Sequence, residues 1–111
     1  MDRGDIYRVP LDPVAGREQR GHRPVVVVST REFNDLCGIP IVVPISTGAD
    51  FARVRGFTVS LTGTGLDTHG VVRCDQPRAL DLRERKATRV SERVPEPIIN
   101  EILAKLTAIF E

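Results

Sequence analysis

The chain has 111 residues and a formal net charge of +1, with 41% hydrophobic and 28% charged residues. This length and composition predict one folded domain over residues 1–111 and argue against disorder. No apolar run approaches the ~20 residues of a membrane span, and the charged N-terminus lacks a secretory signal, so we expect a cytoplasmic protein with no membrane contact.

Arginine supplies all but two of the 16 basic residues, the exceptions being Lys86 and Lys105. The planar guanidinium fits phosphate and carboxylate bidentately, whereas a merely solvated surface uses lysine more freely. A GC-rich coding bias is the alternative explanation, but clusters of arginine in loops beside glycines favour anion binding. The two cysteines, Cys37 and Cys74, have no metal-ligand spacing and are expected to be reduced thiols.

Short strands separated by turns rich in glycine and proline dominate most of the sequence. They are predicted over 5–11, 23–28, 39–45, 57–61, 69–74 and 78–82. The run from Val25 to Val28 is apolar on both faces, so that strand should be central and covered twice. A short helix over 31–36 is expected between strands, capped by Ser29 or Thr30 and ended by Gly38.

A C-terminal helix is the best-determined element, with Pro95 or Pro97 in its first turn and Glu96 near the positive end of its dipole. Its apolar residues form one wide stripe that should be buried against a sheet or a partner, and core packing is the expected case. They are Ile98, Ile99, Ile102, Leu103, Leu106, Ile109 and Phe110. We therefore predict a mainly β fold with a C-terminal α-helix, as a strongly bent sheet or a small, partly open β-barrel.

The densest chemical motif is the tripeptide Arg73-Cys74-Asp75. Because side chains alternate across a strand, the guanidinium and the carboxylate should share one face while Cys74 lies on the other. Gln76 and Arg78 add an amide and a second guanidinium directly afterwards. An Arg and an Asp two residues apart most often form a surface ion pair, and an acid–base site is the alternative.

A second constellation is the charged loop that precedes the valine strand. It carries Glu18, Gln19, His22 and Arg23 between two glycines. Functional side chains are commonly placed where a rigid strand begins or ends. His22 is either a general base or a surface histidine, and Glu18 and Arg23 either act in a site or pair to hold the loop.

Several short sequence segments occur along the whole chain in a characteristic order and spacing. They are Arg3-Gly4-Asp5-Ile6, Leu11-Asp12-Pro13, Gly16 with Glu18-Gln19, Gly21 with Arg23-Pro24-Val25, Pro44-Ile45-Ser46, Phe51-Ala52-Arg53, the run 70–78, and Arg93-Val94-Pro95-Glu96. Each is weak alone, but together they resemble the MazF/PemK toxin endoribonucleases. The similarity is closest to the PemK branch, also called Kid.

The resemblance implies an SH3-like small barrel, a homodimer, and sequence-specific cleavage of single-stranded RNA with no metal or other cofactor. It implies a cognate PemI/MazE-like antitoxin, expected to be an acidic, partly disordered segment, with any DNA contact made only through the antitoxin complex. Asp75 would be the general base and Arg73 the acid or transition-state stabiliser. The products would carry 2′,3′-cyclic phosphate and 5′-OH ends.

Elementary chemistry supports some of these implied roles better than others. The pKa of arginine, above ~12, makes Arg73 a poor acid, so electrostatic stabilisation suits it better. A carboxylate beside Arg73 should have a lowered pKa, which weakens Asp75 as a base unless bound RNA desolvates it. Glu18 and Arg23 match the wider MazF pattern and are further candidates, and Arg17 stands where the PemK branch carries histidine.

RNA contact is expected from hydroxyls, arginines and one aromatic ring. The candidates are Ser46, Thr47, Gly48, Phe51, Arg53, Arg55, His69, Gln76, Arg78 and Arg85. Phe57 is expected to be a core residue, and His69, which replaces a hydroxyl residue of the family, should alter the preferred RNA sequence. A CcdB-like gyrase poison and an SH3-like interaction module are the alternatives, although the chain has no tryptophan of the kind that CcdB toxins use.

Overall fold

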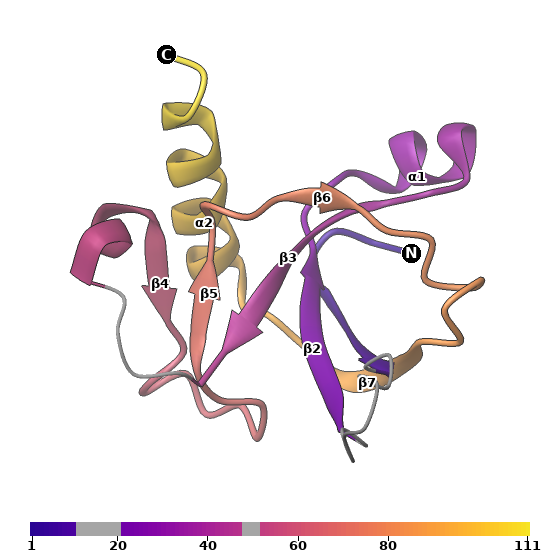
Figure 1. Cartoon of the computed structure of the whole chain (residues 1–111), viewed down its shortest axis with the longest axis horizontal. Helices are drawn as coiled ribbons and strands as arrows, with labels where there is room; N and C mark the ends of the chain where they lie inside the picture. Colours follow the sequence, from indigo (N-terminus) through magenta and orange to yellow (C-terminus); the bar gives the residue numbers. More distant parts are fainter. Residues whose placement is uncertain (11–20, 48–51) are drawn as a thin grey trace, which may run out of the picture.

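The computed structural model describes residues 1–10, 21–47 and 52–111. Figure 1 shows short strands and two α-helices in this part of the chain. In chain order the elements are β1 (Asp5–Pro10), β2 (His22–Val27), α1 (Arg31–Cys37), β3 (Ile41–Ser46), the 3-10 helix η1 (Ala52–Phe57), β4 (Thr58–Ser60), β5 (Val71–Arg73), β6 (Arg78–Ala79), β7 (Thr88–Arg93) and α2 (Glu96–Ala108). The predicted mainly β fold with a C-terminal helix is confirmed.

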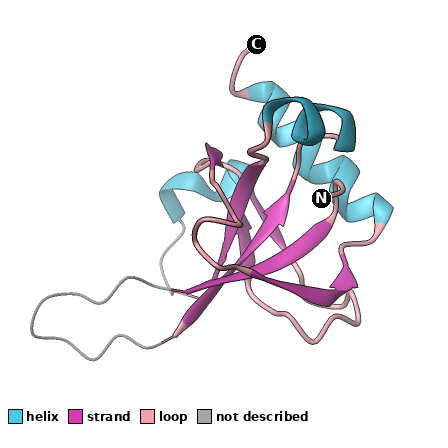
Figure 2. Ribbon diagram, turned by 90° about the vertical axis from the view of Figure 1, so that its right-hand side faces the viewer, coloured by secondary structure: helices cyan, strands magenta, loops and turns pink. Residues whose placement is uncertain are grey.

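All of these strands pair antiparallel, in the order β4-β5-β3-β2-β1-β7, with β6 paired to β3 off this path. The valine strand β2 lies between β1 and β3, so its predicted central position is confirmed. The sheet is strongly twisted, and both α-helices lie toward the same end of the molecule (Figure 2).

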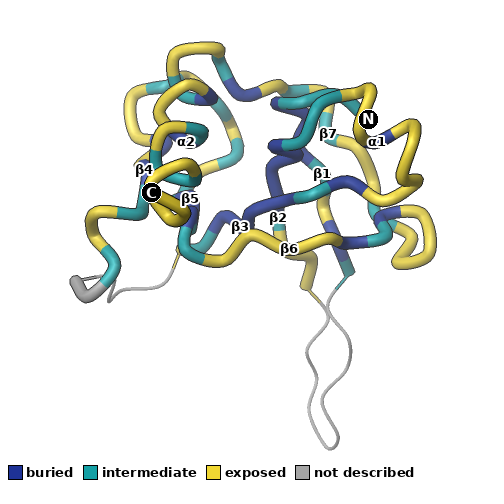
Figure 3. The backbone as a smooth tube through the Cα atoms, turned by 90° about the horizontal axis from the view of Figure 1, so that it is seen from above, coloured by how far each residue is buried: buried dark blue, intermediate teal, exposed yellow. Residues whose placement is uncertain are grey.

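Two hydrophobic cores cover the two faces of the sheet, and consecutive valines of the central strand alternate between them. Val26 and Val28 belong to one of them, the first core, while Val25 and Val27 belong to the other, the second core. This is the period-two alternation of a strand whose faces are both apolar. Buried residues accordingly follow β1, β2 and β3 through the middle of the molecule (Figure 3).

The helix α1 begins and ends as its sequence indicates, whereas α2 ends earlier than its apolar stripe suggests. The Thr30 side chain accepts a hydrogen bond from the Phe33 N–H at 3.2 Å, and Gly38 ends α1 with a φ of 78°. In α2, Ile99 and Ile102 are buried against the first core. The helix α2 ends at Ala108, and Ile109 and Phe110 beyond it are exposed, so they do not pack on the sheet of this chain. Burial of these two side chains against a partner stays a prediction.

The sequence prediction missed one strand and made two others too long. The polar strand β7 was not expected, and the strands predicted over 69–74 and 78–82 are the shorter strands β5 and β6. Phe57 ends η1 instead of starting a strand, but it packs against the first core as predicted. The cysteines are both free thiols, as expected. Within the described ranges, no helix is long and apolar enough to cross a membrane.

Candidate active site

The guanidinium of Arg73, at the end of β5, forms a two-pronged ion pair with Asp75. Its Nε and Nη2 donate to Oδ1 and Oδ2 of Asp75, each at 2.8 Å. Both side chains are mostly shielded, with 18% and 21% of their surfaces exposed. Cys74, between them in sequence, is fully buried in the first core. The predicted shared face and the opposite orientation of Cys74 are confirmed.

The pairing shifts the pKa values of Arg73 and Asp75, while burial shifts that of Cys74. The hydrogen bonds from Arg73 lower the pKa of Asp75, and the same contact raises the pKa of Arg73. Burial raises the pKa of Cys74 to about 11, so its thiol stays protonated at neutral pH. The motif therefore presents a fixed cation and its counter-ion, with no thiolate nucleophile.

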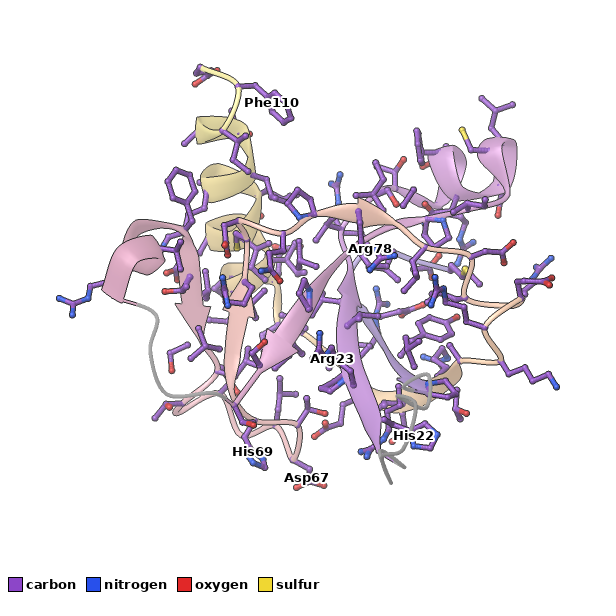
Figure 4. All side chains as sticks on the ribbon, viewed as in Figure 1. His22, Arg23, Asp67, His69, Arg78 and Phe110 are labelled. Atoms are coloured by element: carbon purple, nitrogen blue, oxygen red, sulfur yellow. The ribbon has the colours of Figure 1, made fainter. Side chains whose placement is uncertain are left out.

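Arg73 forms part of the wall of a pocket of about 520 Å³. The pocket lies where β1, β2, β3 and β5 meet the loop before β5, and Figure 4 labels residues on both of its sides. It is lined by Arg8, His22, Arg23, Pro24, Ile45, Ser46, Thr47, Asp67, Thr68, His69 and Arg73. Asp75 is not among the lining residues, so it bears on the pocket through the Arg73 guanidinium.

The charge of this lining favours an anion. Among the described residues of the lining there are three guanidinium groups, those of Arg8, Arg23 and Arg73, and one carboxylate, that of Asp67. The hydroxyls of Ser46 and Thr47 add neutral donors on one side. Such a set of forked cations and hydroxyls matches phosphate oxygens in both charge and geometry.

The loop that precedes β5 is fixed by a carboxylate from β7. Glu92 accepts hydrogen bonds from the backbone N–H of Asp67, from the backbone N–H of Thr68 at 3.0 Å and from the Thr68 hydroxyl at 2.9 Å. These bonds lower the pKa of Glu92. His69 Nδ1 lies 3.3 Å from the carbonyl oxygen of Asp67, and since a carbonyl only accepts, Nδ1 carries the proton of this contact.

A second pocket, of about 210 Å³, adjoins the first through Arg23, which lines both. Its polar residues are Arg23, Gln76, Arg78 and Arg85. The remaining lining residues are apolar or proline: Val9, Pro10, Val25, Val42, Pro44 and Leu80. The two pockets therefore adjoin at Arg23, and guanidinium groups line both.

The sequence of residues 2–110 matches the family of the PemK-like, MazF-like toxins of type II toxin-antitoxin systems. The chain belongs to this family. It is 53% identical to "Endoribonuclease PemK" of Escherichia coli over 98% of this chain and 81% of that protein. It is 43% identical to "Endoribonuclease toxin ChpB" of Escherichia coli K12 over 100% of this chain and 95% of that protein.

The fold of this PemK-like chain is also that of the solved MazF structures. A MazE-MazF crystal structure from Deinococcus radiodurans matches with a TM-score of 0.81 and 31% identity, over 98% of this chain and 94% of that chain. MazF crystallised without MazE from the same organism matches with a TM-score of 0.77 and 31% identity, over the same shares of the two chains. The predicted family and its fold are confirmed.

Much of the predicted site of this PemK-like toxin gathers around the two pockets. Arg23, Ser46, Thr47, His69 and Arg73 line the first, while Gln76, Arg78 and Arg85 line the second with Arg23. Arg55 is exposed on η1 and lines neither, and Arg53 is described only as a backbone position of that helix. Arg17, Glu18, Gly48 and Phe51 lie outside the described residues.

Four residues around the first pocket were not expected from the sequence: Arg8, Asp67, Thr68 and Glu92. Arg8 had a usable signal, since the antiparallel pairing of the first two strands places it opposite Pro24. Glu92 had none, because its contacts join positions 24 and 25 residues apart. In the part of the chain that is described, no three His, Cys, Asp or Glu side chains are grouped to hold a metal ion.

Proposed function

We propose that this PemK-like endoribonuclease toxin cuts single-stranded RNA in the Arg73 pocket, with the scissile phosphate against the Arg73 guanidinium. The observation that carries the proposal is a guanidinium held by two 2.8 Å bonds to Asp75 within the wall of a cationic pocket. A preorganised cation stabilises charge that develops on a phosphate without reorganising at the moment of reaction.

RNA carries its own nucleophile for this reaction. The 2′-oxygen attacks the neighbouring phosphorus, its proton passes to a base, and the bond from phosphorus to the 5′-oxygen breaks. The leaving oxygen takes a proton from water, which gives 2′,3′-cyclic phosphate and 5′-OH ends. Arg73, with Arg8 and Arg23 in the same lining, faces the negative charge that grows on the phosphorane oxygens. DNA lacks the nucleophile and is not a substrate.

Asp75 has two successive tasks in this scheme. In the RNA-free protein it holds Arg73, and that contact lowers its pKa. A bound phosphate competes for the same guanidinium, because Arg pairs bidentately with either anion. As the guanidinium turns to the phosphate, the carboxylate loses the bonds that depress its pKa and becomes a stronger base for the 2′-OH proton.

The second pocket extends the RNA site. Arg78 and Arg85 provide phosphate contacts beside an apolar floor that accepts a nucleobase or ribose face. Ser46, Thr47 and His69 line the first pocket, and in this proposal they contact base edges and so set the cleavage sequence. A homodimer deepens such shallow pockets into a groove, which an acidic cognate antitoxin would cover. Messenger RNA in the cytoplasm is the proposed target.

The direct test is cleavage of one long RNA in excess EDTA, with end analysis and mapping of the cut sites. We expect wild-type protein to leave cyclic phosphate ends, and Arg73→Ala and Asp75→Ala to lose at least about a hundredfold in rate. A matched RNA with a single 2′-deoxy nucleotide at the mapped site should resist cutting there alone. Full activity of both variants would remove the motif from the mechanism.

Gyrase supercoiling assays distinguish the proposed endoribonuclease from the main alternative, a CcdB-like gyrase poison. A CcdB-like poison would block gyrase and leave RNA intact, whereas the proposed toxin leaves gyrase active. A protein that is inert in both assays would support an interaction module instead.

A further inference from the structure

Glu92 is the one carboxylate in the described part of β7, and it reaches across to a different part of the chain. Its two oxygens accept three hydrogen bonds from residues 67 and 68, two of them from backbone N–H groups. Charge-assisted bonds to backbone N–H groups are stronger than neutral ones and fix the path of the main chain. Glu92 is not among the lining residues of either pocket beside Arg73, so its contacts serve the loop and not a ligand.

The same loop is fixed at its far end by a close backbone approach. Gly70 has a φ of 128°, and a Cβ built on it would lie 2.7 Å from the carbonyl oxygen of Ser46. The carbonyl of Gly70 also accepts a hydrogen bond from the Leu61 N–H at 3.0 Å. The segment from Asp67 to His69 is therefore held between Glu92 on one side and the end of β3 on the other.

The segment from Asp67 to His69 forms one side of the first pocket. Asp67, Thr68 and His69 all belong to its lining, opposite the β2 residues His22 and Arg23 (Figure 4). The carbonyl oxygen of Asp67 accepts a hydrogen bond from Nδ1–H of His69, which leaves Nε2 as the ring nitrogen that can accept a hydrogen bond. Movement of the Asp67 backbone would thus move the imidazole and change which base edges the pocket can accept.

We propose that Glu92 is a positioning residue that sets RNA selectivity by holding the Asp67–His69 segment against the Arg73 pocket. The inference rests on the proposed function, since it assigns the base-reading wall of the same site. Arg73 ends β5, the strand that follows this segment, and its two bonds to Asp75 do not involve Glu92. Loss of Glu92 should therefore alter which RNA is bound more than how fast a correctly bound RNA is cut.

The test compares Glu92→Ala and Glu92→Gln with wild type on a long RNA and on a short oligonucleotide that contains the mapped site. For Glu92→Ala we expect KM on the preferred site to rise roughly tenfold or more, while kcat changes less than about threefold. The ranking of cut sites on the long RNA should also change. Glu92→Gln keeps one acceptor oxygen, so its shift should be smaller and in the same direction.

Thr30→Ala is the matched control. It also removes a side-chain acceptor from a backbone N–H, that of Phe33, but on α1, and Thr30 lines no pocket described above. Loss of this helix cap should lower the stability of the fold and leave the cut-site ranking unchanged. A changed ranking in Thr30→Ala would mean that destabilisation alone alters selectivity, and the inference would fall.

The outcomes also separate this inference from the proposed function. If wild-type protein does not cut RNA, the proposed function fails first. If wild type cuts RNA and Glu92→Ala cuts the same sites with unchanged KM, only the role of Glu92 fails. If Glu92→Ala loses kcat as strongly as Arg73→Ala at unchanged KM, Glu92 acts on the chemical step and the proposal as stated is overturned.

Discussion

The Arg73 guanidinium is held by one anion while its proposed substrate offers another. The two bonds to Asp75 orient the planar guanidinium before RNA binds, so a phosphate that enters the pocket meets a cation already in place. In the proposed scheme, the exchange of partners lets one carboxylate serve as an anchor before binding and as a base afterwards.

This exchange of partners predicts a difference between the pH profiles of kcat and kcat/KM. A base must be deprotonated, so activity falls as pH drops through its pKa. Because Arg73 lowers the pKa of Asp75 in the free protein, kcat/KM should show no acid limb from Asp75 above pH ~4. In the proposed RNA complex Asp75 loses the hydrogen bonds that lower its pKa, so the acid limb in kcat should lie at higher pH than the limb in kcat/KM.

The measurement needs a background in which other groups do not titrate. His22 and His69 also line the pocket, so the two profiles should be recorded with both replaced by glutamine. Coincident acid limbs in kcat and kcat/KM would contradict the exchange of partners. In that case Asp75 would act on Arg73 alone.

Residue-level reasoning from the sequence was strongest where local geometry decides the outcome. Strand alternation alone placed Arg73 and Asp75 on one face and Cys74 in the core. It failed for Glu92, because a partner 24 or 25 residues away depends on how the loop before β5 folds over β7. Contacts of that range have no periodic signal along the chain.

Among the elements, the loop from β4 to β5 depends most on glycine, and for two different reasons. Gly65 has a φ of 82° with nothing within 4 Å of a built Cβ, whereas Gly70 combines a φ of 128° with the close approach to Ser46. Gly65→Ala should cost about 1 kcal/mol in the free energy of unfolding. Gly70→Ala should cost roughly 2–4 kcal/mol, because backbone must also move.

Urea denaturation of both variants checks this difference. Since the moved backbone is that of Ser46, Gly70→Ala should also impair RNA cleavage, while Gly65→Ala should leave it close to wild type. Equal stabilities for the two variants would show that the close approach carries no cost.

Element types were predicted well wherever an apolar pattern was strong, as in β2 and α2. The strand β7 was missed because it is polar along most of its length, with only Val90 as a large apolar residue packed on the core. The stripe of α2 was predicted one turn too long, since periodicity does not reveal where the helix ends. Tertiary pairing, not local preference, decides these cases.

At the scale of the whole molecule, several carboxylates bind protons less readily in the folded state than in the unfolded chain. Arg31 lowers the pKa of Asp2 to about 2, and the pKa values of Asp75 and Glu92 are lowered by Arg73 and by backbone N–H groups respectively. A lowered folded-state pKa gives stability that is present above the unfolded pKa and lost as pH falls through the folded one.

The free energy of unfolding should therefore be nearly flat with respect to these carboxylates from about pH 5 to 8 and fall below about pH 4. Urea titrations at a series of pH values measure this slope. The double variant Asp2→Asn, Glu92→Gln should show a shallower fall than wild type between about pH 4 and pH 2. An unchanged slope would show that other groups dominate acid unfolding.

The way Glu92 holds its loop has a consequence for how such toxins diversify. Two of its three bonds come from backbone N–H groups, which every residue except proline supplies whatever its side chain. The side chains at positions 67 and 69 are therefore left free to vary without loosening the clamp. In the proposed site, Glu92 of β7 holds the loop backbone whatever side chains stand at positions 67 and 69, so single substitutions there should change the RNA preference and leave the path of the loop unchanged.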